Sequence, residues 1–252
     1  MVPLFSVGFF LLGAIIASFV GVIVARLNTG ESFLVGRSRC DACAEPLQSH
    51  ALVPILSYFV SGGRAHCCGA RISAYAPLME FLLGGLFVLA YLKLGLVSAL
   101  PFLLLSLAVL LALVLYDLLH QILPFPMLAV FIVSAAMTGF LLAYSVAAFV
   151  DTLLVALLVA ASLALIHVLS RGRAMGLADA PLVFGLALLV GPAALPGFIF
   201  SFWIGGVIVI VVLAQRPRGS RMGVEVPFAP YLATGFLLAY FTQWNPFTLI
   251  IG

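Results

Sequence analysis

Charged side chains are scarce in this sequence. Eleven basic and eight acidic residues make up only 8% of its 252 residues, whereas soluble domains average about 25%. Apolar residues reach 65%, so what remains cannot build a water-facing surface. This composition excludes a soluble globular enzyme, a nucleic-acid-binding domain and a disordered tail. We expect a multi-pass protein that lies in a lipid bilayer and has no nucleic-acid partner.

Two features of a secretory signal peptide are also lacking. No basic residue precedes the first apolar run, residues 4–25, and no small-x-small pattern follows it. A cleaved signal peptide normally has both. We therefore expect this run to be a retained membrane helix.

Long apolar runs predict an all-α membrane bundle of about eight transmembrane helices. A helix needs about 20 largely apolar residues to cross the hydrocarbon core. The stretch 180–214 is too long for one crossing, and Gly191-Pro192 and Pro196-Gly197 divide it into two. The expected spans are residues 4–25, 77–92, 97–116, 125–149, 152–169, 180–191, 197–214 and 229–242.

The basic residues predict the orientation, because short cytoplasmic loops of membrane proteins carry an excess of Lys and Arg. Ten of the eleven fall on one side of the eight spans, and only Lys93 lies on the other side. Both termini are then outside. The ten are Arg26, Arg37, Arg39, Arg64, Arg71, Arg171, Arg173, Arg216, Arg218 and Arg221.

The apolar runs and the polar stretch after the first of them divide the chain into three regions. Residues 1–25 form the first transmembrane helix, residues 26–75 a small cytoplasmic domain that holds all four cysteines, and residues 76–252 a transmembrane core. A loop of this length with few large apolar side chains needs a staple if it is to fold.

The cysteines are the candidate staple. Cys40 and Cys43 form a CxxC pair, and Cys67 and Cys68 are adjacent and follow His66. Thiols stay reduced in the cytoplasm, so a structural disulfide is not expected. A structural zinc ion would take Cys40, Cys43 and Cys68, with either Cys67 or His66 as the fourth ligand. Unliganded thiols are the alternative.

Two aspartates differ from the other acidic residues in their expected depth in the membrane. Asp117 ends the third predicted span and Asp179 opens the sixth, so both lie at the cytoplasmic boundary. Two carboxyls close together share a proton, and one then acts as base and the other as acid. Alternatively, each aspartate caps a helix or reaches toward the interface.

Three other polar residues lie near helix ends. His120 follows Asp117 by three residues, and we expect an ordinary interfacial histidine there. His167 lies near the end of the fifth span, where packing between helices is expected. Glu80 falls in the first turn of the second span, where a structural and a catalytic role are both open.

Six segments in order resemble the type IV prepilin peptidases, membrane aspartyl proteases of the GxGD class. They are residues 17–27 (ASFVGVIVARL, like GSFLNVVIxRLP), 54–58 (PILSY, like PxxS[WY]), 75–80 (YAPLME, entering the second helix with a glutamate), 117–124 (Asp117 followed by Leu123-Pro124, like Dx5LPD), 175–182 (MGLADAPL, like MGxGDxxL) and 226–231 (VPFAPY, like IPFGPF).

The resemblance implies an endopeptidase of the bacterial inner membrane, with Asp117 and Asp179 as its catalytic residues. Its substrates would be type IV prepilins or pseudopilins, cut at the cytoplasmic face. The family also methylates the new N-terminus with S-adenosylmethionine, although the sequence has no Gly-rich nucleotide loop of the Rossmann kind.

This chain departs from the family pattern at several positions. Ala178 replaces the second glycine of GxGD, Gly21 replaces an asparagine, and Phe125 stands where a second aspartate is frequent. Ala65 occupies the first position of the second cysteine pair. A glycine next to a catalytic aspartate allows backbone conformations that alanine restricts, so low or unusual activity is one expectation.

Two functions of other classes remain open at this point. A proton-coupled transporter also uses intramembrane carboxylates, but near the midplane of broken helices. A non-catalytic membrane subunit of a pilus or secretion assembly would fit the altered GxGD and cysteine motifs.

Overall fold

The computed structural model describes residues 2–29, 32, 39–40, 42–46, 53–172, 175–215 and 227–246. Val226 of the last motif lies outside the described residues, and so do several charged residues of the orientation argument and the cysteine loop. These are Glu31, Arg37, Asp41, His50, Arg173, Arg216, Arg218, Arg221 and Glu225.

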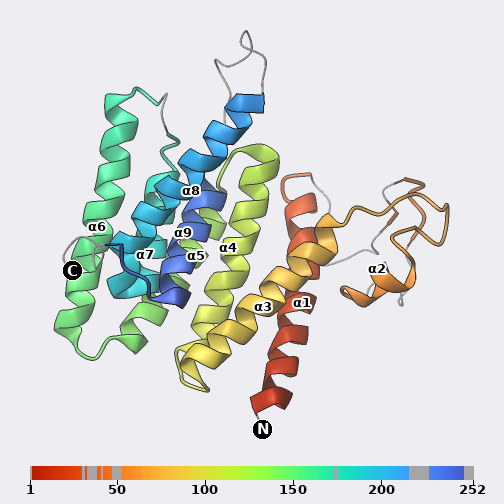
Figure 1. Cartoon of the computed structure of the whole chain (residues 1–252), viewed down its shortest axis with the longest axis horizontal. Coiled ribbons are helices and arrows are strands. Elements are labelled where there is room, and N and C mark those ends of the chain that lie inside the picture. The colour runs from red at the N-terminus through yellow and green to blue at the C-terminus, as the bar shows by residue number, and fades with distance from the viewer. Residues whose placement is uncertain are drawn as a thin grey trace. The chain divides into compact units, whose positions relative to one another are not determined.

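The described chain is helical, as predicted, and its only β pairing is two isolated bridges. The eight expected spans correspond to eight helices, drawn in Figure 1 together with the short α2 (Leu56–Val60). They are α1 (Val2–Arg26), α3 (Tyr75–Leu94), α4 (Leu100–His120), α5 (Phe125–Leu142), α6 (Val146–Leu169), α7 (Asp179–Val190), α8 (Ala194–Gln215) and α9 (Ala229–Thr242).

Six segments of the described chain are long and apolar enough to cross a membrane. Five are α1, α3, α4, α5 and α6, and the sixth is the continuous stretch from α7 into α8. Twelve-residue α7 extends only about 18 Å at 1.5 Å per residue, less than the hydrocarbon thickness of about 30 Å. The protein is therefore a multi-pass helical membrane protein in which α7 and α9 are short.

Two predicted helix boundaries were wrong. The run 125–149 is not one span, because α5 ends at Leu142 and Ser145 begins α6 by accepting a hydrogen bond from the Ala148 N–H at 3.1 Å. Ser is a favourable N-cap, and apolarity alone does not reveal it. Pro196 does not separate two helices either. It lies in the first turn of α8, where proline costs no helical hydrogen bond.

The other predicted break was confirmed. Gly191 ends α7 with a φ of +59°, and the 3-10 turn η2 (Gly191–Ala193) leads into α8. Positive φ suits glycine because it has no Cβ.

The chain forms two compact units, residues 1–96 and 97–252. In the first unit, α1 packs along α3, and a Cβ added to Gly13 would lie 2.8 Å from the Gly84 Cα atom. Phe10 and Phe81 meet edge to face beside this crossing. Backbones approach this closely only where side chains are absent.

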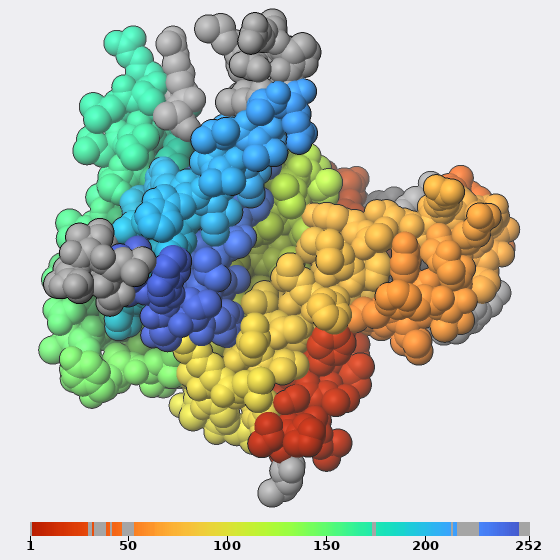
Figure 2. All heavy atoms as spheres, viewed as in Figure 1, coloured from red at the N-terminus to blue at the C-terminus, as the bar shows by residue number. Residues whose placement is uncertain are grey.

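In the second unit, α9 packs against α4, α7 and α8, and α5 packs against α4 and α7. Figure 2 shows the atoms of α8 and α9 in close contact. Of its twelve residues, α7 buries ten, including Asp179. Most of the exposed side chains on the helices are apolar, as expected for a surface that faces lipid. The predicted division at residues 25 and 75 stays a prediction.

Candidate active site and metal centre

Asp117 lies in the last turn of α4 and is 6% exposed. Its Oδ2 accepts a hydrogen bond from the Ala229 N–H at 3.1 Å. Ala229 is the first residue of α9, so the carboxylate meets the positive end of a helix dipole. This contact joins the 117–124 and 226–231 motifs, which are far apart in the sequence.

Asp179 is the first residue of α7 and is 7% exposed. Its Oδ2 accepts a hydrogen bond from the Gly176 N–H at 3.2 Å, within the same motif. Ala178 precedes it with φ −70° and ψ −15°, a right-handed helical conformation that alanine adopts readily. The alanine at this position therefore imposes no backbone strain in this conformation.

Both aspartates lie in the second unit. They lie near enough to interact electrostatically, and each is held by one backbone N–H. A pair of buried carboxyls in repulsion favours the state in which they share one proton. Such a pair can remove a proton from water with one carboxyl and protonate a carbonyl oxygen with the other. Their catalytic roles stay a prediction.

The four cysteines converge in the first unit. Their Sγ atoms all lie within 4.8 Å of one another. The sulfur separations are 3.7 Å for Cys40 and Cys68, 3.3 Å for Cys43 and Cys67, and 3.9 Å for Cys67 and Cys68. A tetrahedral zinc ion with Zn–S bonds of about 2.3 Å separates its sulfurs by about 3.8 Å. The four residues therefore fit zinc in number, element and spacing.

Two hairpins with the same backbone pattern carry these sulfurs. The Cys40 N–H donates to the Glu45 carbonyl, and the Ala65 N–H donates to the Ala70 carbonyl. Ala44 and Gly69, the next equivalent pair, both have positive φ. Ala65 is buried at the position that Cys40 has in the first hairpin. Because that position lacks a thiol, Cys67 brings the fourth sulfur to the cluster.

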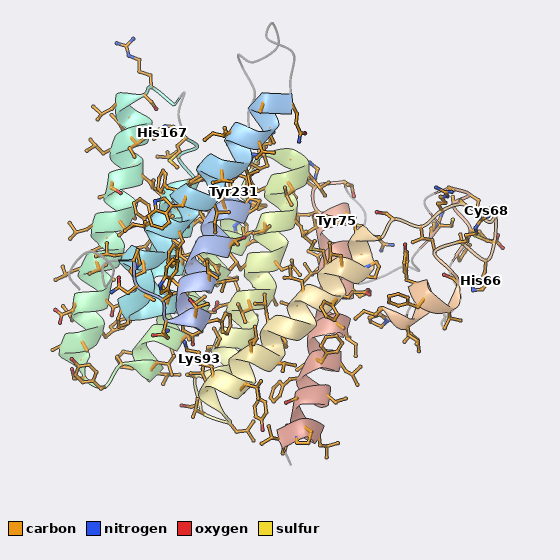
Figure 3. The ribbon with its side chains drawn as sticks, viewed as in Figure 1. His66, Cys68, Tyr75, Lys93, His167 and Tyr231 are labelled. Carbon is orange, nitrogen blue, oxygen red and sulfur yellow. The ribbon has the colours of Figure 1, made fainter. Side chains whose placement is uncertain are left out.

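Of the two residues that the sequence left open as a fourth ligand, the structure places Cys67 in the cluster. The exposed His66 does not belong to the cluster, and Figure 3 shows it apart from Cys68 on the loop.

The thiols differ in acidity. Hydrogen bonds from the Cys43 and Ala42 backbone N–H groups lower the pKa of Cys40 to about 7. The side-chain hydrogen bond with Cys43, together with desolvation, raises the pKa of Cys67 to about 12. Four thiols this close cannot all ionise without a nearby cation, and a zinc ion held by them would supply that charge.

Glu80 has a structural role in the first unit. It is 7% exposed, and its Oε2 accepts a hydrogen bond from the Ile55 N–H at 2.6 Å. Ile55 has a φ of +60°, which is strained for a β-branched residue. The glutamate thus fastens the turn before α2 to the start of α3, and it connects the 54–58 and 75–80 motifs.

The two membrane histidines behave differently. The His120 ring packs against Tyr116 with ring centroids 4.4 Å apart, in keeping with an ordinary interfacial residue. The Nδ1 atom of His167 lies 2.8 Å from the Met175 carbonyl oxygen, which immediately precedes Gly176. Sequence reasoning expected only helix packing for His167. The sequence did contain a signal for this contact. His167 lies near the end of a helix and shortly before the 175–182 motif, which holds Asp179.

Fold and site together define a class: multi-pass helical membrane proteins with a pair of buried aspartates at helix ends and a cluster of four cysteines. The model of the Bacterial Peptidase A24 N-terminal domain family matches residues 11–94. No solved structure matches the chain.

Comparison with curated relatives shows the family to which the chain belongs. A prepilin leader peptidase/N-methyltransferase of Myxococcus xanthus is 33% identical over 227 residues, 87% of this chain and 67% of the relative. Proteins of the same name from Bacillus subtilis (28% identical, 92% of each chain) and Dichelobacter nodosus (30% identical, 83% of this chain and 72% of the relative) also match. The chain belongs to the prepilin leader peptidase/N-methyltransferase family.

Proposed function

We propose that this protein is an aspartic endopeptidase that removes the leader peptide from type IV prepilin-like or pseudopilin substrates. The observation that carries the proposal is a pair of buried carboxyls on two different helices, Asp117 of α4 and Asp179 of α7, each of which accepts one backbone N–H. The names of the relatives supply the substrate class.

In the proposed reaction, the ionised aspartate takes a proton from water, and the water oxygen attacks the scissile carbonyl carbon. The protonated aspartate donates its proton to the carbonyl oxygen, and no covalent enzyme intermediate forms. The backbone hydrogen bonds engage Oδ2 of each carboxyl, so in the proposed reaction Oδ1 of each exchanges the proton. Collapse of the tetrahedral species passes one proton to the leaving amine.

The substrate is a membrane helix preceded by a short polar leader. Its helical backbone is already hydrogen-bonded within itself, so the cleaved segment must locally unwind to present a carbonyl. Asp117 and Asp179 lie at helix ends rather than in helix middles. This placement suits a junction between leader and membrane better than the midplane site of a transporter.

The proposal places the protein in the bacterial inner membrane with its active site near the cytoplasmic face, from the distribution of basic residues. Cys40, Cys43, Cys67 and Cys68 would hold a zinc ion, which would supply structural cross-linking of the loop rather than chemistry. N-methylation with S-adenosylmethionine as methyl donor is proposed on the names of the relatives alone.

Replacing either aspartate tests the proposal. Asp117→Asn and Asp179→Asn keep the size of the side chain but remove its proton exchange, and we expect each to lower prepilin cleavage by at least about 100-fold. The measurement is cleavage of a full-length prepilin by the purified protein in lipid nanodiscs. Asp151→Asn is the matched control, because this exposed aspartate of α6 lies outside the site.

Cleavage that persists in either variant would reject the aspartate pair. A correctly folded wild-type protein that cuts no prepilin would reject the peptidase and favour a non-catalytic subunit of a pilus or secretion assembly.

A further inference from the structure

One peptide group connects His167 with Asp179. The carbonyl oxygen of Met175 lies 2.8 Å from His167 Nδ1, and the N–H of Gly176 donates to Asp179 Oδ2 at 3.2 Å. These two atoms belong to the same Met175–Gly176 peptide. In a trans peptide the C=O and the N–H point to opposite edges, so the peptide lies between the imidazole and the carboxyl.

The tautomer of His167 follows from this contact. A carbonyl oxygen only accepts hydrogen bonds, so Nδ1 must carry the proton that is donated to it. The donated hydrogen bond polarises the peptide and strengthens the hydrogen bond that its N–H makes to Asp179.

The end of α6 holds His167 in place for this contact. The Gly172 N–H and the Ser170 hydroxyl both donate to the His167 carbonyl oxygen, at 2.9 Å and 3.2 Å. Gly172 has a φ of +76°, and a Cβ added to it would lie 3.4 Å from the imidazole Cε1. Figure 3 shows His167 at this end of α6, whose helix packs against α7.

We propose that His167 is a positioning residue of the active site, which orients the Asp179 carboxyl through the Met175–Gly176 peptide. Among the described residues, one backbone N–H donates to the Asp179 carboxyl, that of Gly176, which belongs to a loop rather than to a helix. A loop peptide can rotate unless its carbonyl is also held. The imidazole supplies that second point of attachment. The catalytic part of this inference rests on the proposed peptidase function.

A pair of amide substitutions tests the geometry. In His167→Asn the amide nitrogen takes the place of Nδ1, so the hydrogen bond to Met175 can form. In His167→Gln the nitrogen lies one bond further out, near the place of Nε2, and this hydrogen bond is lost. The two variants match in charge and polarity. We expect kcat for prepilin cleavage to fall about 10-fold in His167→Gln, with KM unchanged, and to stay near wild type in His167→Asn.

A spectroscopic measurement reads the peptide directly and needs no activity. The sequence contains two Met–Gly peptides, Met175–Gly176 and Met222–Gly223. Full-length protein labelled with ¹³C at Met carbonyls and ¹⁵N at Gly therefore gives two carbonyl–amide cross-peaks, and Met222→Leu identifies which is which. We expect the Met175 carbonyl resonance to move upfield in His167→Gln but not in His167→Asn, with the Met222 peak as internal reference.

The outcomes separate the two proposals. A Met175 resonance that does not move in His167→Gln, or a kcat that falls equally in both folded variants or in neither, overturns the positioning role. If the wild-type protein cuts no prepilin, the peptidase proposal fails. The carbonyl resonance then still decides whether His167 holds the Met175–Gly176 peptide.

Discussion

At the residue scale, the proposed chemistry depends on how few groups hold each carboxyl. Asp117 and Asp179 each accept a backbone N–H through one oxygen while their side chains are buried. A carboxylate with two or three donors is strongly stabilised in its ionised form. A single donor fixes the direction of the carboxyl and leaves it able to exchange a proton.

The cysteine cluster permits a residue-scale prediction about its fourth ligand. We expect about one zinc per chain in the purified wild-type protein and in His66→Ala. Cys67→Ser should lose most of the zinc, because three sulfurs remain. Adding Ala65→Cys to Cys67→Ser should restore zinc binding, since Ala65 has the place of Cys40 in the second hairpin. Elemental analysis of the purified protein measures each case.

Zinc loss in His66→Ala with retention in Cys67→Ser would show that the imidazole, not the sulfur, completes the site. A wild-type protein with well under one zinc per chain would leave the unliganded thiols as the correct interpretation.

At the element scale, small residues set the distance between neighbouring helices. In the first unit, Gly13 of α1 faces Gly84 of α3, and in the second unit Gly235 of α9 faces Ser201 of α8. Without a hydrophobic effect between helices in lipid, close van der Waals packing drives their association. Glycine inside a helix lowers the helix propensity. These close contacts explain why glycines nevertheless occur there.

Two alanine substitutions in α1 test this packing. Gly13→Ala would put its Cβ 2.8 Å from the Gly84 Cα and the Leu83 carbonyl oxygen, so the helices must move apart. We expect its free energy of unfolding to fall by about 1–3 kcal/mol. Gly21→Ala is the control, because a Cβ there meets nothing within 4 Å, and it should gain up to about 1 kcal/mol.

Thermal unfolding of the detergent-solubilised protein compares the two variants. Equal transition temperatures for Gly13→Ala and Gly21→Ala would contradict close packing of α1 on α3.

At the scale of the whole molecule, orientation in the membrane decides which substrate segment can reach the aspartates. The basic residues predict that the turn between α5 and α6 is outside and the turn after α6 is cytoplasmic. Tyr144, between α5 and α6, is 93% exposed, and Arg171 after α6 is also exposed.

Cysteine labelling in the full-length chain tests this orientation. We expect a membrane-impermeant maleimide to label Tyr144→Cys in intact cells and Arg171→Cys only after the inner membrane is permeabilised. The wild-type protein, with its four cysteines in the predicted cytoplasmic loop, provides the background. Labelling of Arg171→Cys in intact cells would reverse the topology and remove the cytoplasmic active site.

Much of the helical fold could be predicted because apolar runs report membrane helices directly. The third span, predicted at 97–116, is α4 at Leu100–His120. The boundary at Ser145 was missed because the residues around this serine are mostly apolar, and one side-chain cap begins α6 there. The hydrogen bond of His167 to Met175 could not be predicted, since it depends on how a loop closes.

The sequence by itself determined that this protein lies in a membrane, where its helices run, and which two aspartates differ from the rest, because length and polarity decide what a bilayer accepts. Only the tertiary structure decided that Cys67 joins the sulfur cluster, that α9 caps Asp117, and that one peptide connects His167 to Asp179. Those contacts join atoms from separate segments of the chain, and hydrogen bonds depend on distances and directions that no linear pattern contains.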